Sequence, residues 1–145
     1  MMAMKKLLLI CILLSLNSCG KSKQEIPNFS DFDYDDFQEA HLEYNSLFSM
    51  QKPYYFAYIY SKHCGHCNNI KYKVFEFYYA HKDSFYFIEY SSLIEITDNV
   101  VLTIGATSVC DVRILGTPTL LLIDNWTLSK NIAGEKEILN FMNEI

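Results

Sequence analysis

The sequence predicts an α/β domain in which a central mixed β-sheet is flanked by helices on both faces. Two observations favour this fold class. Apolar residues at intervals of three and four, the spacing of an amphipathic helix, follow Cys64 and again follow Gly134. Short apolar runs rich in aromatic and β-branched residues, which are typical of buried strands, occupy residues 54–60, 85–90 and 119–123.

The first element is expected between Ser30 and Met50. Aspartates at positions 31, 33, 35 and 36 precede apolar residues in this segment. Acidic side chains favour the start of a helix because they complement its positive N-terminal end. We therefore predict a first helix here.

A strand and a second helix follow. Residues 54–60 come directly after Pro53 and are ended by polar residues 61–63, as expected for a short buried strand. The pattern after this strand places Cys64 at the N-terminus of a helix. Its apolar face consists of Cys67, Ile70, Val74, Phe77 and Tyr78.

The sequence Cys64-Gly65-His66-Cys67 carries the strongest chemical information in the chain. At a helix N-terminus, unpaired N–H groups and the helix dipole stabilise a thiolate, and His63 and His66 act in the same direction when protonated. Cys67 lies one turn further along the same face, close enough to form a disulfide with Cys64. The motif therefore predicts a pair that cycles between dithiol and disulfide.

Two alternatives to redox chemistry stay open. Zinc sites use the same cysteine spacing, but a structural zinc normally needs four ligands. The further candidates are Cys110, His41 and His81, none of which belongs to a second paired motif. The other alternative is an inert disulfide, although an exposed turn with flanking histidines is an unusual place for one.

The tetrapeptide from Cys64 to Cys67 resembles the active-site motif of the protein disulfide isomerases and of the thioredoxin superfamily in general. A second resemblance supports the first: Leu115-Gly116-Thr117-Pro118-Thr119 is similar to the cis-proline loop that leads into a central strand in this family. The resemblance extends from Pro53 to the C-terminus and implies a thioredoxin-like fold. It also implies that Pro118 is cis and that the backbone of Thr117 faces the cysteine pair and binds an extended substrate segment.

The chain departs from this family pattern at two positions beside the motif. His63 replaces the tryptophan that usually precedes the first cysteine. Tyr58 stands six residues before Cys64, where many relatives have a buried acid that relays protons to the second cysteine. Proton transfer from Cys67 therefore needs another route.

Residues 91–110 are longer than the equivalent connection in a minimal thioredoxin. We expect their apolar side chains to pack in an enlarged connection, although a substrate-facing surface is an alternative. Cys110 is expected to be a buried small apolar residue rather than a third redox partner. The apolar residues concerned are Leu93, Ile94, Ile96, Val100, Val101, Leu102 and Ile104.

The C-terminal part predicts a β-hairpin followed by a helix. The apolar strand from Thr119 to Ile123 reaches a turn at Asp124-Asn125, and Trp126 to Ile132 forms the returning strand, with Trp126 in core or edge packing. A last helix starts at Gly134. Its apolar residues face the sheet: Ile138, Leu139, Phe141 and Met142.

Residues 1–18 resemble a bacterial lipoprotein signal peptide. Lys5 and Lys6 precede an apolar run of about ten residues, well short of the roughly 20 that a membrane-spanning helix needs. Leu16 and Ser18, at positions −3 and −1 before Cys19, resemble a lipobox, which implies cleavage before Cys19 and lipid attachment to its sulfur. An ordinary signal peptide with an incidental cysteine is the alternative.

This interpretation divides the chain into a signal peptide (1–18), a lipidated cysteine with a flexible tether (19–29) and a thioredoxin-like domain (30–145). It predicts an extracytoplasmic location, lipid-anchored to a bacterial membrane, outside the reducing cytosol. We expect no nucleic-acid partner, because phosphates demand a basic face and 17 acidic residues outnumber 12 basic ones. The sequence predicts neither a metal nor a cofactor.

The function expected from the sequence is thiol–disulfide exchange with protein thiols and disulfides of exported proteins, together with an unidentified redox partner. Cys64 and Cys67 are the expected catalytic residues. The alternative is a thioredoxin-like surface lipoprotein that acts as a binding or transport-accessory module with little turnover. Residues expected to tune the site are His63, Gly65 and His66, and those expected to bind substrate are Thr117 and Pro118.

Overall fold

The computed structural model describes residues 26–145. The signal peptide expected over 1–18, the lipidation site at Cys19 and most of the tether lie outside the described residues. Within residues 26–145, no helix combines the length and the hydropathy that crossing a bilayer requires.

The centre of the molecule is a four-stranded mixed sheet with the strand order β2-β1-β5-β6. Strand β1 pairs in parallel with β2 and antiparallel with β5, and β5 pairs antiparallel with β6. This confirms the predicted mixed sheet and gives the chain a thioredoxin-like α/β fold. The strands are β1 (Tyr54–Tyr60), β2 (Phe85–Glu89), β5 (Thr119–Asp124) and β6 (Thr127–Ala133).

Strand β1 is buried on both faces of the sheet, as its continuous apolar sequence predicts. Because neighbouring side chains of a strand point to opposite faces, Tyr58 and Tyr60 contribute to one hydrophobic cluster, whereas Ala57 and Ile59 contribute to another. Covering both faces of the sheet removes this strand from solvent and gives the domain two cores.

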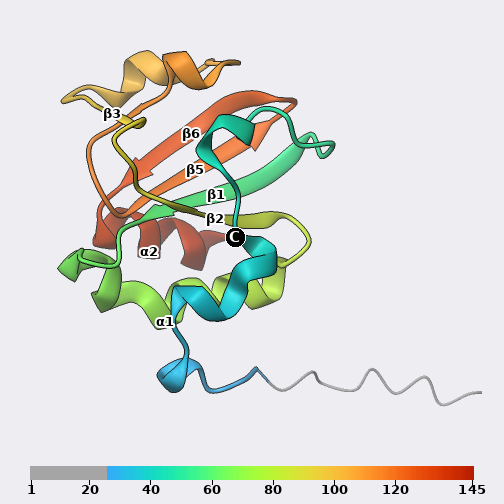
Figure 1. Ribbon diagram of the computed structural model, residues 1–145, viewed down its shortest axis with the longest axis vertical. Helices are drawn as coiled ribbons and strands as arrows, with labels where there is room; N and C mark the ends of the chain where they lie inside the picture. The colour runs from blue at the N-terminus through green and yellow to red at the C-terminus, as the bar shows by residue number, and fades with distance from the viewer. Residues whose placement is uncertain (1–25) are drawn as a thin grey trace, which may run out of the picture.

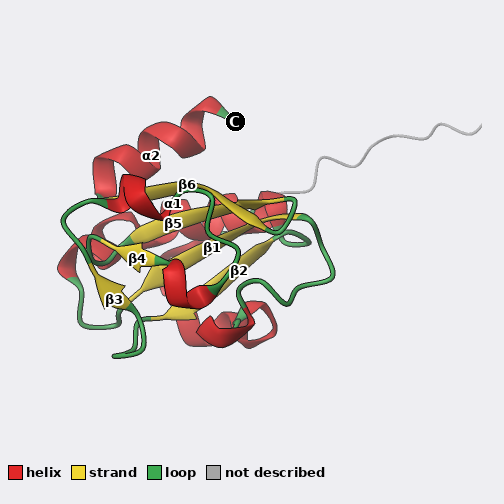
Figure 2. Ribbon diagram, turned by 90° about the horizontal axis from the view of Figure 1, so that it is seen from above, coloured by secondary structure: helices red, strands yellow, loops and turns green. Residues whose placement is uncertain are grey.

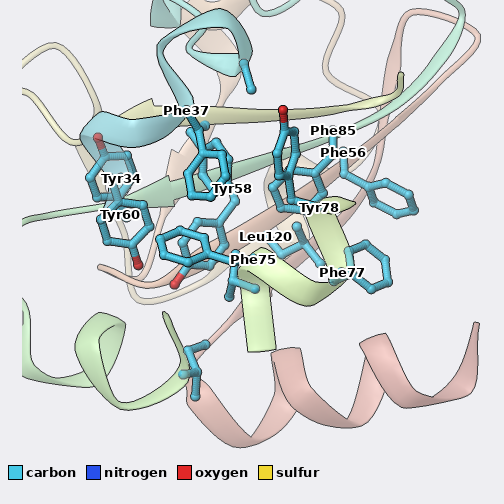
Figure 3. Packing of buried hydrophobic residues seen from close by; sticks show 14 of the residues in the cluster. Tyr34, Phe37, Phe56, Tyr58, Tyr60, Phe75, Phe77, Tyr78, Phe85 and Leu120 are labelled. Atoms are coloured by element: carbon cyan, nitrogen blue, oxygen red, sulfur yellow. The ribbon is translucent and has the colours of Figure 1, made fainter. Parts of the chain in front are cut away.

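Both α-helices lie on the same side of the sheet (Figure 1). They are α1 (Gly65–His81) and α2 (Glu135–Glu144). The core under them is mainly aromatic, and Figure 3 shows its rings clustered between the sheet and α1. In this core Tyr34 stacks on Tyr60 with ring centroids 3.7 Å apart, and Phe37 packs against Phe75 at 4.6 Å.

The opposite face is covered by short 3-10 helices and a small two-stranded parallel sheet rather than by α-helices (Figures 1 and 2). Ile94, Ile114 and Leu121 are buried in the core on this side. The prediction of helices on both faces is therefore met by two kinds of helix. The elements on this side are η3 (Tyr44–Ser46), β3 (Glu95–Ile96), η4 (Val100–Thr103), η5 (Val109–Asp111) and β4 (Arg113–Ile114).

The single helix predicted between Ser30 and Met50 is wrong. Three 3-10 helices occupy this segment, and the longest of them is interrupted at Phe37, whose backbone is not helical. A capping box between Asp33 and Asp36 starts that helix, as the acidic residues predict. After this helix the backbone becomes extended, because His41 pairs with Phe87 at the edge of β2. The three helices are η1 (Phe29–Asp31), η2 (Tyr34–Ala40) and η3.

The packing expected of the 91–110 segment is also largely wrong. Ile94 is buried, but the side chain of Leu102 is 81% exposed, and Cys110 is exposed rather than buried. Apolar composition does not predict burial here, because short 3-10 turns leave several side chains without a surface to cover. The other exposed apolar residues are Leu93, Ile96, Val101 and Ile104.

The C-terminal hairpin is confirmed, with its turn one residue later than expected. Asn125 and Trp126 both have positive φ, 48° and 56°, as the two central residues of a type I′ turn require. Trp126 is consequently half exposed, and its indole N–H donates to the carbonyl oxygen of Met50 at 2.9 Å. In α2, Ile138 is buried under the sheet as predicted.

Candidate functional site

Cys64 lies where β1 ends and α1 begins. It is the N-cap residue of α1 with an extended backbone, and its own N–H donates to the carbonyl oxygen of Ser61 at 3.1 Å. The sulfur accepts a hydrogen bond from the main-chain N–H of Cys67 at 3.1 Å. An N–H group at a helix N-terminus thus points at this sulfur, as the sequence predicts, and it would stabilise a thiolate there.

The two cysteines have different environments. Cys64 is half-buried, whereas Cys67 is completely buried, and both are free thiols. Burial raises the pKa of the Cys67 thiol to about 12, and its interaction with Cys64 acts in the same direction. Cys64 is therefore the sulfur that an external disulfide can reach, and Cys67 is held protonated behind it.

The loop before β5 meets the cysteine pair from the other side. The peptide bond between Thr117 and Pro118 is cis, as the family resemblance implies. The thiol of Cys64 donates to the carbonyl oxygen of Thr117 at 3.2 Å, so the backbone of Thr117 faces the pair as expected. The structure thereby brings together residues that are 53 positions apart in the sequence.

His66 turns toward α2 rather than toward Cys67. Its ring nitrogen Nδ1 bonds a carboxylate oxygen of Glu135, and the side-chain amide of Asn69 donates to both oxygens of the same carboxylate at 3.1 and 3.2 Å. Sequence reasoning missed Glu135 and Asn69. An acidic residue at a helix start is ordinary, and only the fold shows that this one faces His66.

His63 and Gly65, which were expected to tune the site, are both exposed on its outer rim. The main-chain N–H of His63 donates to the hydroxyl of Ser61 at 3.3 Å. A Cβ built on Gly65 would meet no atom within 4 Å, so the glycine is not required by packing. Neither residue contacts a cysteine sulfur through a hydrogen bond within residues 26–145.

Two tyrosines lie beneath Cys67. Tyr58 is completely buried, and its hydroxyl forms no hydrogen bond with any described residue. Burial, and then the neighbouring Tyr34, raise the pKa of Tyr58, so it remains a neutral phenol. Tyr34, from the N-terminal 3-10 segment, donates to the carbonyl oxygen of Cys67 at 3.4 Å. Sequence reasoning missed Tyr34, because nothing in its local pattern points to the cysteines.

An open groove of about 380 Å³ runs beside the cysteine pair between α1, the cis-proline loop and α2. His66 lines one side, Thr117 and Pro118 line the second, and the first turn of α2 lines the third. Thr117 connects this groove to the cysteine pair, because its carbonyl oxygen accepts from the thiol of Cys64. Its α2 side consists of Gly134, Glu135, Lys136 and Glu137.

The residues considered as further zinc ligands have other partners or lie away from the cysteine pair. No group of three or more His, Cys, Asp or Glu side chains in residues 26–145 is arranged to hold a metal ion. His41 instead bonds the hydroxyl of Tyr60 at 2.8 Å, and His81 stacks on Phe77. Cys110 lies exposed in η5, on the face opposite to α1.

No protein-family model matches the sequence, and no curated protein matches it at a significant level. Among solved structures, the chain is similar to thioredoxin f2 of Chlamydomonas reinhardtii, with 15% sequence identity and a TM-score of 0.48 over 72% of this chain and 93% of that one. It is also similar to mitochondrial thioredoxin 3 of Saccharomyces cerevisiae, at 13% identity and a TM-score of 0.46 over 74% and 97% of the two chains. A thioredoxin of Plasmodium falciparum is similar at 15% identity and a TM-score of 0.44, over 70% of this chain and 89% of that one. These similarities concern the fold alone.

Proposed function

We propose that this protein is a thiol–disulfide oxidoreductase in which Cys64 is the attacking sulfur and Cys67 the resolving one. One observation carries the proposal: the sulfur of Cys64, at the N-terminus of α1, accepts the N–H of Cys67 and lies against the carbonyl of Thr117. The N–H of Cys67 favours a negative sulfur, and the half-burial of Cys64 leaves that sulfur reachable. The carbonyl of Thr117 is a backbone acceptor that a substrate strand can use once Cys64 has lost its proton.

The reaction follows from the unequal burial of the two sulfurs. A thiolate at Cys64 attacks one sulfur of a substrate disulfide, that disulfide breaks, and the electron pair leaves with the other substrate sulfur. Cys67 then loses its proton and attacks Cys64, which releases the second substrate sulfur and leaves the Cys64–Cys67 disulfide. In the oxidising direction the same steps run in reverse.

The second step needs a proton acceptor for Cys67, and Tyr58 does not supply one. A neutral phenol with a raised pKa takes the place of the acid that relatives use. We therefore propose that solvent entering from the half-exposed Cys64 side removes this proton. Resolution by Cys67 is then slow compared with attack by Cys64, because the raised pKa of Cys67 leaves few thiolates at neutral pH.

The proposed substrates are protein thiols and disulfides of exported proteins. This part of the proposal rests on residues 1–18 and Cys19, whose pattern is typical of a lipoprotein leader and its lipidation site. The tether predicted over 19–29 ends at Phe29, whose side chain is buried against α1. A tether of this length keeps the domain within about 35 Å of the bilayer on which it is anchored.

The test is insulin reduction by dithiothreitol, with purified residues 26–145 as the catalyst. We expect the wild-type chain to accelerate the reaction and Cys64→Ser to abolish the acceleration. Cys110→Ser is the matched control, because Cys110 is exposed but lies away from the pair, and it should retain full activity. Equal rates for wild type and Cys64→Ser would exclude the enzymatic function.

A binding module is the second candidate function, and the exposed apolar side chains of residues 93–104 favour it. In this case the domain holds a partner and turns over little. Cys64→Ser would then leave partner binding intact while Leu102→Asp weakens it. Insulin reduction by the wild type at the rate of the uncatalysed reaction would favour this candidate.

A further inference from the structure

The first turn of α2 fixes the position of the active-site histidine. Glu135 accepts a bond from Nδ1 of His66, and the amide of Asn69 holds both oxygens of its carboxylate. The hydrogen bonds from His66 and then from Asn69 lower the pKa of Glu135, so the carboxylate is charged at neutral pH. The imidazole ring is therefore tied to a fixed anion rather than free to rotate.

The cis-proline loop positions Glu135. The N–H of Gly134 donates to the carbonyl oxygen of Pro118 at 3.0 Å, and Gly134 has a positive φ of 95°. This contact starts α2 directly beside the loop that carries Thr117. The residue that holds His66 and the residues that face Cys64 thus belong to one connected unit.

The other ring nitrogen of His66 is free. No residue among 26–145 hydrogen-bonds Nε2, and the side chain is 73% exposed. His66 lines the groove that Thr117 and Pro118 also line, and Lys136 and Glu137 are the other charged residues of that groove. With Nδ1–H bonded to a carboxylate, the neutral ring carries its lone pair on Nε2.

We propose that Glu135 is a positioning residue that holds His66 so that Nε2 accepts the proton of a substrate thiol entering the groove. The inference rests on the proposed function and deepens it, because it identifies the group that takes the proton of the substrate thiol in the first oxidising step. The arrangement follows the logic of other catalytic histidines, in which a carboxylate orients the ring through one nitrogen and the reaction uses the other.

In this step the substrate thiol reduces the Cys64–Cys67 disulfide. The sulfur of a substrate thiol bonds to the sulfur of Cys64, and the Cys64–Cys67 disulfide breaks. The electron pair of that bond goes to the sulfur of Cys67, which is reduced, while the substrate sulfur is oxidised. The thiol proton passes to Nε2, and Glu135 stabilises the imidazolium that results.

The experiment measures the second-order rate constant for attack of glutathione on the oxidised protein, by acid quench and mass spectrometry. At pH 7, Glu135→Gln is expected to lower this rate about tenfold, less than the roughly 10²–10⁴-fold that a whole general acid or base contributes, because the imidazole of His66 remains in place. At about pH 9.5 glutathione is itself a thiolate, so the difference should disappear. A merely structural role of Glu135 would lower the rate at both pH values.

Two further variants make the result specific. Glu144→Gln, at the far end of the same helix, is the matched control and should stay within about twofold of wild type. His66→Phe should lose as much as the double variant with Glu135→Gln, because both substitutions act on one ring. Nitrogen NMR of His66 should show the Nδ1–H tautomer in wild type and a mixture in Glu135→Gln.

The outcomes separate this inference from the proposed function. If the wild-type disulfide does not react with glutathione at all, the proposed function fails. If it reacts and Glu135→Gln matches Glu144→Gln at pH 7, the function stands and the role of Glu135 is overturned. A loss that persists at pH 9.5 overturns it equally.

Discussion

The hydroxyl of Tyr34 donates a hydrogen bond to the main-chain carbonyl of Cys67 at 3.4 Å, across 33 positions of sequence. Tyr34 belongs to the N-terminal 3-10 segment, outside the sheet and its two α-helices. The segment that precedes the four-stranded sheet thus supports the first turn of α1 from below. Its aromatic packing links the position of Cys67 to the N-terminal part of the domain.

The first prediction concerns this bond. Tyr34→Phe keeps the ring stacked on Tyr60 and removes only the hydroxyl, so unfolding should become easier by about 1 kcal/mol. Tyr34→Ala also removes the ring and should cost about 3–5 kcal/mol. Urea unfolding measures both values. Equal losses for the two variants would show that the ring contributes nothing, contrary to its burial.

The second prediction concerns Tyr58, whose buried hydroxyl has no hydrogen-bond partner among the described residues. A buried polar group without a partner costs free energy, so Tyr58→Phe should leave stability unchanged or raise it by up to about 1 kcal/mol. The same variant should not slow insulin reduction, because the phenol transfers no proton in the proposed mechanism. Destabilisation above 1 kcal/mol would indicate a hydrogen-bond partner, for example the neighbouring hydroxyl of Tyr34.

The strands and the turn at Cys64 could be predicted because their signals are local. Residues 54–60 are continuously apolar since both faces of β1 are covered, and Cys64 occupies the N-cap because the helical spacing begins there. The cis-proline loop was found by family resemblance, since its place beside the cysteines depends on the fold.

The parts that were missed depend on contacts between distant segments. The bond between His66 and Glu135 spans 69 positions, and neither residue signals its partner. The 3-10 helices between 29 and 46 have no regular period that a sequence pattern could reveal. In residues 93–104, apolar composition is the same whether a side chain packs or faces solvent, so only the three-dimensional structure distinguishes Ile94 from Leu102.

The third prediction uses the turn that starts α2. Gly134 has a φ of 95°, and a Cβ added there would come within 2.9 Å of a carboxylate oxygen of Glu137. Gly134→Ala should therefore destabilise the domain by about 1–2 kcal/mol, chiefly through the backbone, since the Glu137 side chain can move. Thermal unfolding provides the measurement. Gly65→Ala, where a Cβ meets nothing and φ is not positive, is the matched control and should be nearly neutral.

The fourth prediction concerns stability at alkaline pH. The pKa of Cys67 is raised from the ordinary value of 9.0 to about 12, mainly by burial, so between these values the folded protein binds a proton that the unfolded chain releases. This contribution is complete below pH 9 and is lost as the pH rises toward 12. The buried tyrosines, whose pKa values are also raised, act in the same direction.

Urea unfolding of the reduced protein at pH 8, 9 and 10 should show stability falling with pH. Cys67→Ala removes one of the groups responsible, so its stability should fall less steeply over this range, whatever the cost of the substitution at pH 8. Cys110→Ala, at an exposed thiol, should follow the wild-type slope.

The alkylation of Cys67 in the reduced protein should likewise lag behind that of Cys64 at every pH up to 10, because the buried sulfur is both less accessible and still protonated. If the free energy of unfolding falls equally steeply with pH for wild type and Cys67→Ala, the buried thiol ionises as easily in the folded protein as in the unfolded chain. The proposed role of Cys67 as the protected, resolving sulfur would then lose its electrostatic basis.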